Sequence, residues 1–185
     1  AMKTALYQGR VIHIDETRLQ VLQEPGREAT KQSFMWVYCG GTPDHPTIWF
    51  QYAETRSGAV PQQFLFPDPP EVGDAAPPSD GMYLLSDGYC AYTALALQAG
   101  IICHAACWAH VRRKFVEAAE GRKHTAAAHQ MVALIRALYA VERDCRDLTA
   151  EERKAVRERR SKPILDKIKA WLDGKAPKVL PKGLL

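Results

Sequence analysis

The sequence has no long hydrophobic run, no leader-like N-terminus and few cysteines, and each absence narrows the class of protein. No apolar stretch in the 185 residues approaches the roughly 20 needed to span a bilayer. The first residues also lack the basic, apolar and small-residue order of a signal peptide. Lysine and arginine exceed aspartate and glutamate by only 25 to 21, which permits an anionic partner without requiring one. We therefore expect a cytoplasmic protein with no membrane attachment.

The cysteines are an odd number in a chain long enough to fold without disulfides, so reduced thiols are expected. They are Cys39, Cys90, Cys103, Cys107 and Cys145. Hydrophobic residues make up 46% of the chain, which is enough for one sizeable core. This composition predicts one domain with an appendage, rather than two independent globular domains.

The first hundred residues are expected to form mainly strands, because β-branched and aromatic residues cluster in short runs between Gly, Pro and charged turns. The expected strands are 11–14 with 18–22 continuing it past a kink, 33–39 ending at Gly40 and Gly41, 47–52, 82–86 and 101–106. Short connections favour an antiparallel meander for the first three, and a helix-forming segment at 91–97 favours parallel pairing of the last two. The expected fold is therefore α/β with a mixed sheet. The Pro-rich stretch 66–81 is typical of a mobile surface loop.

From Trp108 onward the apolar spacing is that of helices. The expected helices are 108 to about 121, 125–145, and a third that starts at a capping box of Thr149 and Glu152, breaks or kinks near Pro163 and stops at Gly174. The tail 175–185 is typical of a linker.

Two carboxylates follow expected strands: Asp15 after 11–14 and Asp87 after 82–86. If these strands are parallel neighbours, both aspartates lie at the same carboxyl edge of the sheet, where ligands of such sheets bind. Few carboxylates and a substrate phosphate suit Mg²⁺. The alternative is that each aspartate only begins a turn, and Asp87-Gly88 is a common turn dipeptide.

Several ordered motifs extend this pattern over residues from about 10 to the end of the chain. They are Asp15-Glu16-Thr17 with Gln20-Val21-Leu22, Trp36-Val37-Tyr38, Ser86-Asp87-Gly88-Tyr89 with Tyr92, and Cys107-Trp108-Ala109-His110 with Arg112-Arg113-Lys114-Phe115 and Glu117-Ala118. Together they resemble the motifs of the insertion sequence 66 family of transposases. The last block is the most specific, since several uncommon residues share one register.

The resemblance implies a ribonuclease H-like fold and cleavage and joining of DNA strands that depends on Mg²⁺ or Mn²⁺. It also implies that Asp15 and Asp87 are the first two of three catalytic, metal-binding carboxylates, two aspartates and a glutamate. DNA, both transposon ends and target, is the implied partner, and a homo-oligomer is expected for the full-length protein.

The third carboxylate of the family is a glutamate in an Asn-rich stretch on a later helix, and no such stretch occurs in these 185 residues. We therefore expect 3–121 to be an incomplete catalytic core, 122–174 a helical insertion and 175–185 a linker. A chain that lacks this glutamate should be inactive or nearly so on its own. The alternative is a truncated protein that only binds DNA or an intact transposase.

Cys107 and His110, with Cys103 and His104, also form a pattern of potential zinc ligands. A zinc-stabilised interaction module is therefore a further hypothesis. The family resemblance instead implies that Cys107 and His110 brace the edge of the active site.

Three consecutive cations, Arg112, Arg113 and Lys114, are candidates for contacts with DNA phosphates. An ordinary solvated helix face is equally compatible with them.

Overall fold

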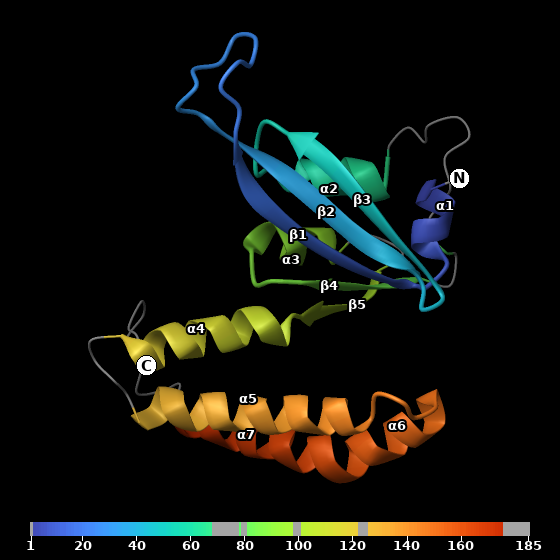
Figure 1. The fold of residues 1–185 in the computed structure, drawn as a ribbon, viewed down its shortest axis with the longest axis vertical. Coiled ribbons are helices and arrows are strands. Elements are labelled where there is room, and N and C mark those ends of the chain that lie inside the picture. The colour runs from blue at the N-terminus through green and yellow to red at the C-terminus, as the bar shows by residue number, and fades with distance from the viewer. Residues whose placement is uncertain (1, 68–77, 79–80, 98–100, 122–125, 176–185) are drawn as a thin grey trace. The chain divides into compact units, whose positions relative to one another are not determined.

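The computed structural model describes residues 2–67, 78, 81–97, 101–121 and 126–175 (Figure 1). It divides the chain into two compact units, residues 1–107 and 108–185. The first contains a five-stranded sheet with short helices, and the elements of the second are all helical. Each unit has its own cluster of buried apolar side chains, whereas the composition had predicted one core.

The sheet of the first unit has the strand order β3-β2-β1-β4-β5. Its strands are β1 (Val11–Gln20), β2 (Gln32–Thr42), β3 (His45–Ala53), β4 (Met82–Ser86) and β5 (Ile101–Ala106). β2 pairs antiparallel with β1 and β3, whereas β4 runs parallel to both β1 and β5. The predicted combination of an antiparallel three-strand meander with parallel strands is thus confirmed.

Two strands are longer than the sequence predicted. β1 continues through Asp15, because it remains paired with β2 as far as Gln20 after its pairing with β4 has ended. β2 continues through Gly40 and Gly41. A Cβ at Gly40 would overlap the carbonyl oxygen of Leu6, and Gly41 has a φ of +86°. These glycines therefore permit close approach of the N-terminal segment to the strand, and they do not end it.

Three short helices belong to the first unit: α1 (Met2–Tyr7), α2 (Ala59–Leu65) and α3 (Cys90–Leu95). Only α3 was expected, so the prediction of mainly strands before residue 100 missed α1 and α2. Both are fixed by packing rather than by local propensity. Leu6 and Leu65 are fully buried, and the Tyr7 hydroxyl donates to the Leu65 carbonyl at 3.0 Å.

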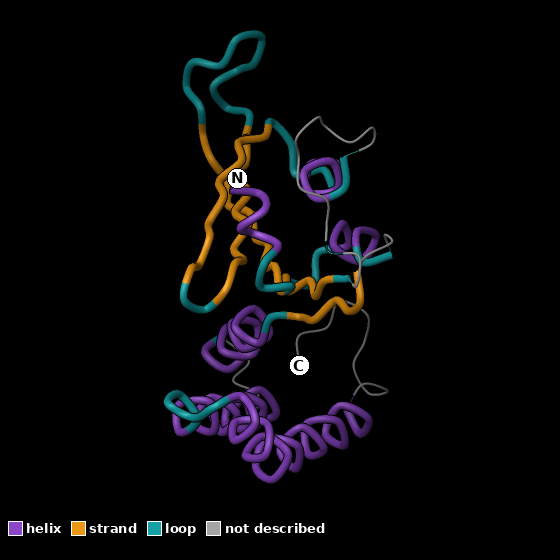
Figure 2. Tube along the Cα trace, turned by 90° about the vertical axis from the view of Figure 1, so that its right-hand side faces the viewer, coloured by secondary structure: helices purple, strands orange, loops and turns teal. Residues whose placement is uncertain are grey.

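One face of the sheet carries the core of this unit. Figure 2 shows α2 and α3 on the same side of the strands. The buried cluster on that side consists of Leu6, Tyr7, Ile12, Ile14, Trp36, Tyr38, Leu65, Met82, Leu84, Tyr92 and Leu95. Burial raises the pKa of Tyr38 and of Tyr92 well above its usual range, and the Tyr38 hydroxyl donates to Gln51 Oε1 at 2.8 Å.

The second unit contains α4 (Trp108–Glu120), α5 (Ala126–Asp144), α6 (Ala150–Val156), the π-helical turn η1 (Arg157–Ser161) and α7 (Lys162–Lys175). Val111 and Phe115 of α4 pack against the buried Met131 and Ile135 of α5, with Ile168 of α7. Because α4 packs on α5, the compact units divide at 107/108, whereas the expected boundary between core and insertion lay at 121/122. Whether the helices are an insertion stays a prediction.

The third predicted helix starts at its capping box and changes its helical geometry next to Pro163. Thr149 accepts a hydrogen bond from the Glu152 backbone, and the Glu152 side chain accepts from the Thr149 backbone, so the capping box is confirmed. Pro163 lacks an N–H for the ordinary helical bond, and a π-helical turn directly precedes α7 in place of a break. Gly174 lies inside α7, which ends one residue later than expected.

The predicted loop 66–81 and linker 175–185 lie mostly outside the described residues. Among the described helices, none is both long and apolar enough to cross a membrane.

Removing the cap should loosen α6. Thr149→Ala deletes the side-chain acceptor of the capping box and should cost about 1 kcal/mol. Amide hydrogen exchange in α6 should accelerate roughly five-fold, which is the same free energy expressed as a rate. Thr149→Ser retains the acceptor and should keep wild-type protection, and equal exchange in the two variants would contradict the assignment.

The buried tyrosines should make the first unit sensitive to alkali. In the unfolded chain a tyrosine ionises near pH 10, whereas the folded pKa values of Tyr38 and Tyr92 are raised. Their contribution to stability is therefore complete below about pH 10 and is lost as pH rises further, by up to about 1.4 kcal/mol per pH unit for each tyrosine.

Urea unfolding between pH 9 and 11 measures this loss. Tyr38→Phe and Tyr92→Phe should each give a shallower decline of unfolding free energy with pH. Tyr83→Phe, at an exposed position of β4, should keep the wild-type slope. A slope that no tyrosine substitution changes would exclude these two residues as its source.

Candidate functional site

The parallel pairing of β1 with β4 brings the segments that carry Asp15 and Asp87 side by side. Val11, Ile12 and His13 pair with Tyr83, Leu84 and Leu85 respectively. The ladder ends there; continued by two residues, the same register would bring Asp15 level with Asp87, and adjacent strands lie about 4.8 Å apart. Asp15 lies inside β1 and not at its end. The closeness of the two carboxylates stays a prediction.

Both aspartates lie on the sheet face opposite the core. Along β1, Ile12 and Ile14 are buried on the core face, while Asp15 is exposed. Along β4, Leu84 and Ser86 are buried, and Asp87 follows them with a half-buried side chain. Since side chains alternate between faces, Asp15 and Asp87 emerge from the same one. The pair is therefore open to a ligand.

The end of β4 is held by hydrogen bonds around Asp87. Asp87 Oδ1 accepts the Tyr89 N–H at 2.8 Å, which forms the turn that the Asp-Gly dipeptide had indicated. Ser86 Oγ lies 2.7 Å from His104 Nε2 on β5, and the Ser86 carbonyl accepts the Cys107 N–H at 2.7 Å. The turn thus uses one carboxylate oxygen, and the second accepts no hydrogen bond from the described residues. Turn formation and ligand binding are compatible at this residue.

A charged network centred on a buried carboxylate lies on the core face of the sheet. Glu16, next to Asp15, has a side chain only 1% exposed. Its carboxylate accepts hydrogen bonds from the Arg56 guanidinium and from the Tyr92 hydroxyl. We call Glu16, Arg56, Tyr89 and Tyr92 the Glu16 network.

Tyr89 connects this network to the turn at Asp87. The Arg56 guanidinium stacks on the Tyr89 ring at 4.0 Å from its centroid, and the Tyr89 hydroxyl donates to the Arg56 carbonyl at 3.0 Å. Since the Tyr89 N–H also binds Asp87 Oδ1, a continuous chain of contacts runs from the residue after Asp15 to Asp87 itself. The network therefore links the strand that carries Asp15 to the turn at Asp87.

Charge in this region is predominantly negative. Burial raises the pKa of Tyr92 first, and the hydrogen bond to Glu16 and the charges of Glu16, Asp15 and Asp87 raise it further. Burial lowers the pKa of Arg56, but the bond and charge of Glu16 outweigh burial and leave it raised. The charges of Glu16 and Asp87 thus act on Arg56, and those of Glu16, Asp15 and Asp87 act on Tyr92.

The other predicted site residues are distributed over both units. Cys107 ends the first unit, whereas His110 and the cations Arg112, Arg113 and Lys114 lie on α4 of the second. Lys114 is paired with Glu117 at 3.2 Å. Within the described ranges, no group of three or more His, Cys, Asp or Glu side chains is arranged to hold a metal ion. The roles of these five residues stay predictions.

Sequence reasoning missed the ion pair of Glu16 with Arg56. Glu16 adjoins Asp15 in the recognised motif, and strand alternation could have placed it on the buried face. Arg56 lies in a loop without any motif, so only the folded chain reveals that it pairs with Glu16 forty residues earlier.

Comparison with known proteins gives the family of the chain. The family model described as "Transposase IS66 family" matches residues 1–185. The uncharacterized protein y4jD of Sinorhizobium fredii (strain NBRC 101917 / NGR234) is 32% identical over 168 residues, covering 85% of this chain and 30% of that protein. The uncharacterized protein y4hP of the same strain is 29% identical over 181 residues, covering 87% of this chain and 30% of that protein.

The chain thus spans about 30% of the length of these curated relatives. No solved structure matches it significantly. Because the family model covers every residue, the chain belongs to the IS66 family of transposases.

Proposed function

We propose that this chain forms the metal-binding part of a transposase core that cleaves and joins DNA strands by phosphoryl transfer. The observation that carries the proposal is the parallel pairing of β1 with β4, whose register, continued by two residues, would bring Asp15 level with Asp87. Family membership supports the reaction class.

The strand order also supports a ribonuclease H-like core. The sheet β3-β2-β1-β4-β5 combines an antiparallel meander with two parallel strands, and β1 lies at its centre. In this proposal the sheet unit is the catalytic scaffold. The helices of the second unit are the insertion expected before the final catalytic helix.

The residues present fit a hard divalent cation. Asp15 and Asp87 supply oxygen ligands, and Mg²⁺ or Mn²⁺ commonly binds through one or two carboxylates with water and substrate phosphate filling other positions. Such ions would activate the attacking oxygen and stabilise the leaving oxygen at phosphorus. The protein's own contribution is to hold the two carboxylates side by side and to leave their face accessible.

The third carboxylate is proposed to come from sequence beyond these 185 residues. Glu16 does not supply it, because its side chain is buried on the core face and already binds Arg56 and Tyr92. We therefore expect this chain alone to bind metal weakly and to lack cleavage activity. Cys107 and His110 are proposed to brace the site edge, and Arg112, Arg113 and Lys114 to contact DNA.

Loss of either aspartate should abolish the reaction in a protein that continues this chain to the length of its relatives. Asp15→Asn and Asp87→Asn should each lower Mg²⁺-dependent cleavage of labelled terminal-repeat DNA by at least about 100-fold, which is more than loss of an outer-shell group usually costs. Asp44→Asn, at the exposed turn between β2 and β3, is the matched control and should cleave normally. Undiminished cleavage by Asp87→Asn would refute the assignment.

The Glu16 network should be needed for stability and for the geometry of the aspartates. Arg56→Met leaves the buried Glu16 carboxylate without its cation and should cost roughly 1–3 kcal/mol, a range that allows for the partial exposure of Arg56. The double variant Glu16→Leu/Arg56→Met removes both charges and should recover part of this loss in urea unfolding.

A second readout separates positioning from stability. Broadening of Asp15 and Asp87 NMR signals by Mn²⁺ should require a higher metal concentration in the double variant than in the wild type, under conditions where both are folded. Unchanged broadening would show that the network stabilises the fold without positioning the aspartates.

A further inference from the structure

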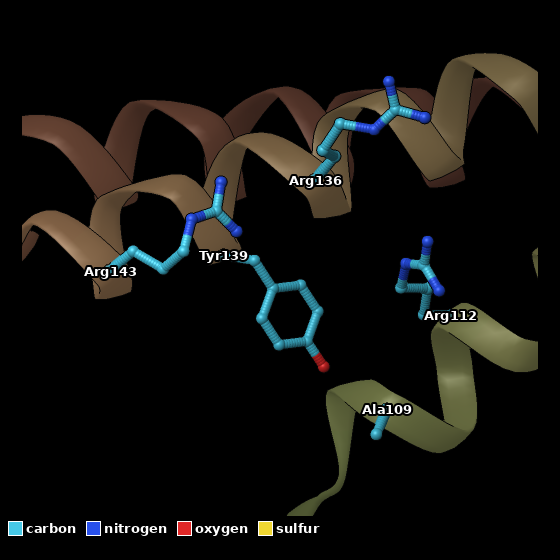
Figure 3. A pocket seen from close by; sticks show the side chains of 5 residues that line it. All are labelled: Ala109, Arg112, Arg136, Tyr139 and Arg143. Carbon is cyan, nitrogen blue, oxygen red and sulfur yellow. The ribbon is translucent and has the colours of Figure 1, made fainter.

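A pocket of about 320 Å³ in the second unit is lined almost entirely by cationic and aromatic side chains. Ala109 and Arg112 come from α4, and Arg136, Tyr139 and Arg143 come from α5. Figure 3 shows Arg112 extending from α4 toward α5, with the Tyr139 hydroxyl directed toward α4 near Ala109. The two helices pack against each other within one compact unit, so the pocket does not depend on the sheet unit.

The helical spacing of α5 puts its three lining residues on one face. Arg136, Tyr139 and Arg143 are three and four residues apart, and such positions are neighbours on a helix surface. Their apolar counterparts Ile135 and Leu138 face the core. Arg136 and Arg143 are exposed, and Tyr139 is 36% exposed. The cationic row is therefore available to a partner.

Among the described residues, no carboxylate lines the pocket. Within the part of the chain that the structure describes, no ion pair or hydrogen bond involves the side chain of Arg112, Arg136 or Arg143. Neighbouring cations behave differently, since Arg157 pairs with Glu142 at 2.6 Å and Arg160 with Asp144 at 2.7 Å. The acids of this part of α5 are thus engaged away from the pocket.

Clustering three unmatched cations raises the energy of the folded unit, because like charges on a helix surface repel. A bound anion would remove that repulsion. Arginine also suits phosphate, since its planar fork can form two parallel hydrogen bonds to one phosphate group. Tyr139 adds a hydroxyl donor of the kind that often contacts phosphate oxygens.

The length of the row favours a polyanion over a single phosphate. Arg136 and Arg143 are seven residues apart, which is roughly 10 Å along the helix axis. One strand of duplex DNA presents a charge about every 3.4 Å along its axis, so the row extends over more than one phosphate of the same strand. A shallow, exposed site also fits contacts with a backbone better than burial of a small molecule.

We propose that Arg112, Arg136, Tyr139 and Arg143 form a binding site for the phosphate backbone of DNA, independent of base sequence. The proposal rests on the proposed function for its choice of DNA among polyanions. In this proposal the first unit carries out the cleavage and joining of DNA strands, and the helices of the second unit bind the DNA. Of the cations expected to contact DNA, Arg112 belongs to this site, whereas Lys114 pairs with Glu117.

The test measures the affinity of this chain for a fluorescently labelled 30-base-pair duplex of arbitrary sequence. Binding is monitored by fluorescence anisotropy at NaCl concentrations between 50 and 200 mM. Arg136→Gln/Arg143→Gln should weaken binding at least about ten-fold at the lowest salt concentration. Loss of two phosphate contacts should also reduce the slope of log K against log salt by about 1.8. Tyr139→Phe should weaken binding with no change in slope, because it removes no charge.

The matched control is Arg159→Gln/Lys167→Gln. It removes the same charge from exposed positions of η1 and α7 outside the pocket, and it should bind nearly as the wild type. An equal loss in both double variants would overturn the site, because attraction would then follow net charge alone. Failure of the wild-type chain to bind the duplex would overturn it as well.

The outcome is separable from that of the catalytic proposal. Arginine-dependent binding by a protein in which Asp87→Asn has no effect on cleavage supports this site and refutes the catalytic assignment. Aspartate-dependent cleavage with binding insensitive to Arg136 and Arg143 gives the reverse result.

Discussion

The candidate site depends on a parallel ladder of only three residue pairs between β1 and β4. Continued by two residues, this short pairing would put Asp15 and Asp87, 72 positions apart in the sequence, on one face and at one level of the sheet. Everything else in the first unit supports that ladder. β2 holds the far half of β1, β5 holds the outer edge of β4, and the buried cluster fixes the opposite face. The chemistry proposed for the site thus follows from backbone pairing more than from any local feature of the aspartates.

Buried charge contributes a second constraint. Taking Glu16 out of water is unfavourable unless its oxygens find strong donors, and Arg56 and Tyr92 supply them. Arg56 and Tyr92 also contact Tyr89, which binds the turn at Asp87. The donors that offset the cost of burying Glu16 thus connect β1 to that turn.

Much of the fold was predictable because its signals are local. β4 and β5 match their expected bounds, and α4 and α5 follow their apolar spacing to within a residue or two. The capping box at Thr149 could be recognised from two residues alone. The helices α1 and α2 could not, since each is one or two turns long and is stabilised by contacts such as Tyr7 with Leu65. The Gly40-Gly41 pair resembled the end of a strand. Glycine is needed at position 40 because Leu6 approaches its backbone closely, and no residue near Gly40 in the sequence indicates that contact. The candidate aspartates could be recognised as acids that follow or lie in strands. The pairing of Arg56 with Glu16, and the pocket that Arg136, Tyr139 and Arg143 form with α4, could be recognised only in the folded chain.

Asp15 and Glu16 are consecutive residues whose side chains lie on opposite faces of the sheet. The Asp15 side chain is exposed, and the Glu16 side chain is buried against Arg56. In an extended strand this division depends only on the parity of their positions. A single-residue insertion or deletion earlier in β1 that shifted its alignment against β4 would exchange the two, exposing Glu16 and burying Asp15. Length changes upstream of Asp15 are therefore far more damaging than most substitutions there, and the spacing between the start of β1 and this acidic pair should be among the least adjustable distances in the chain.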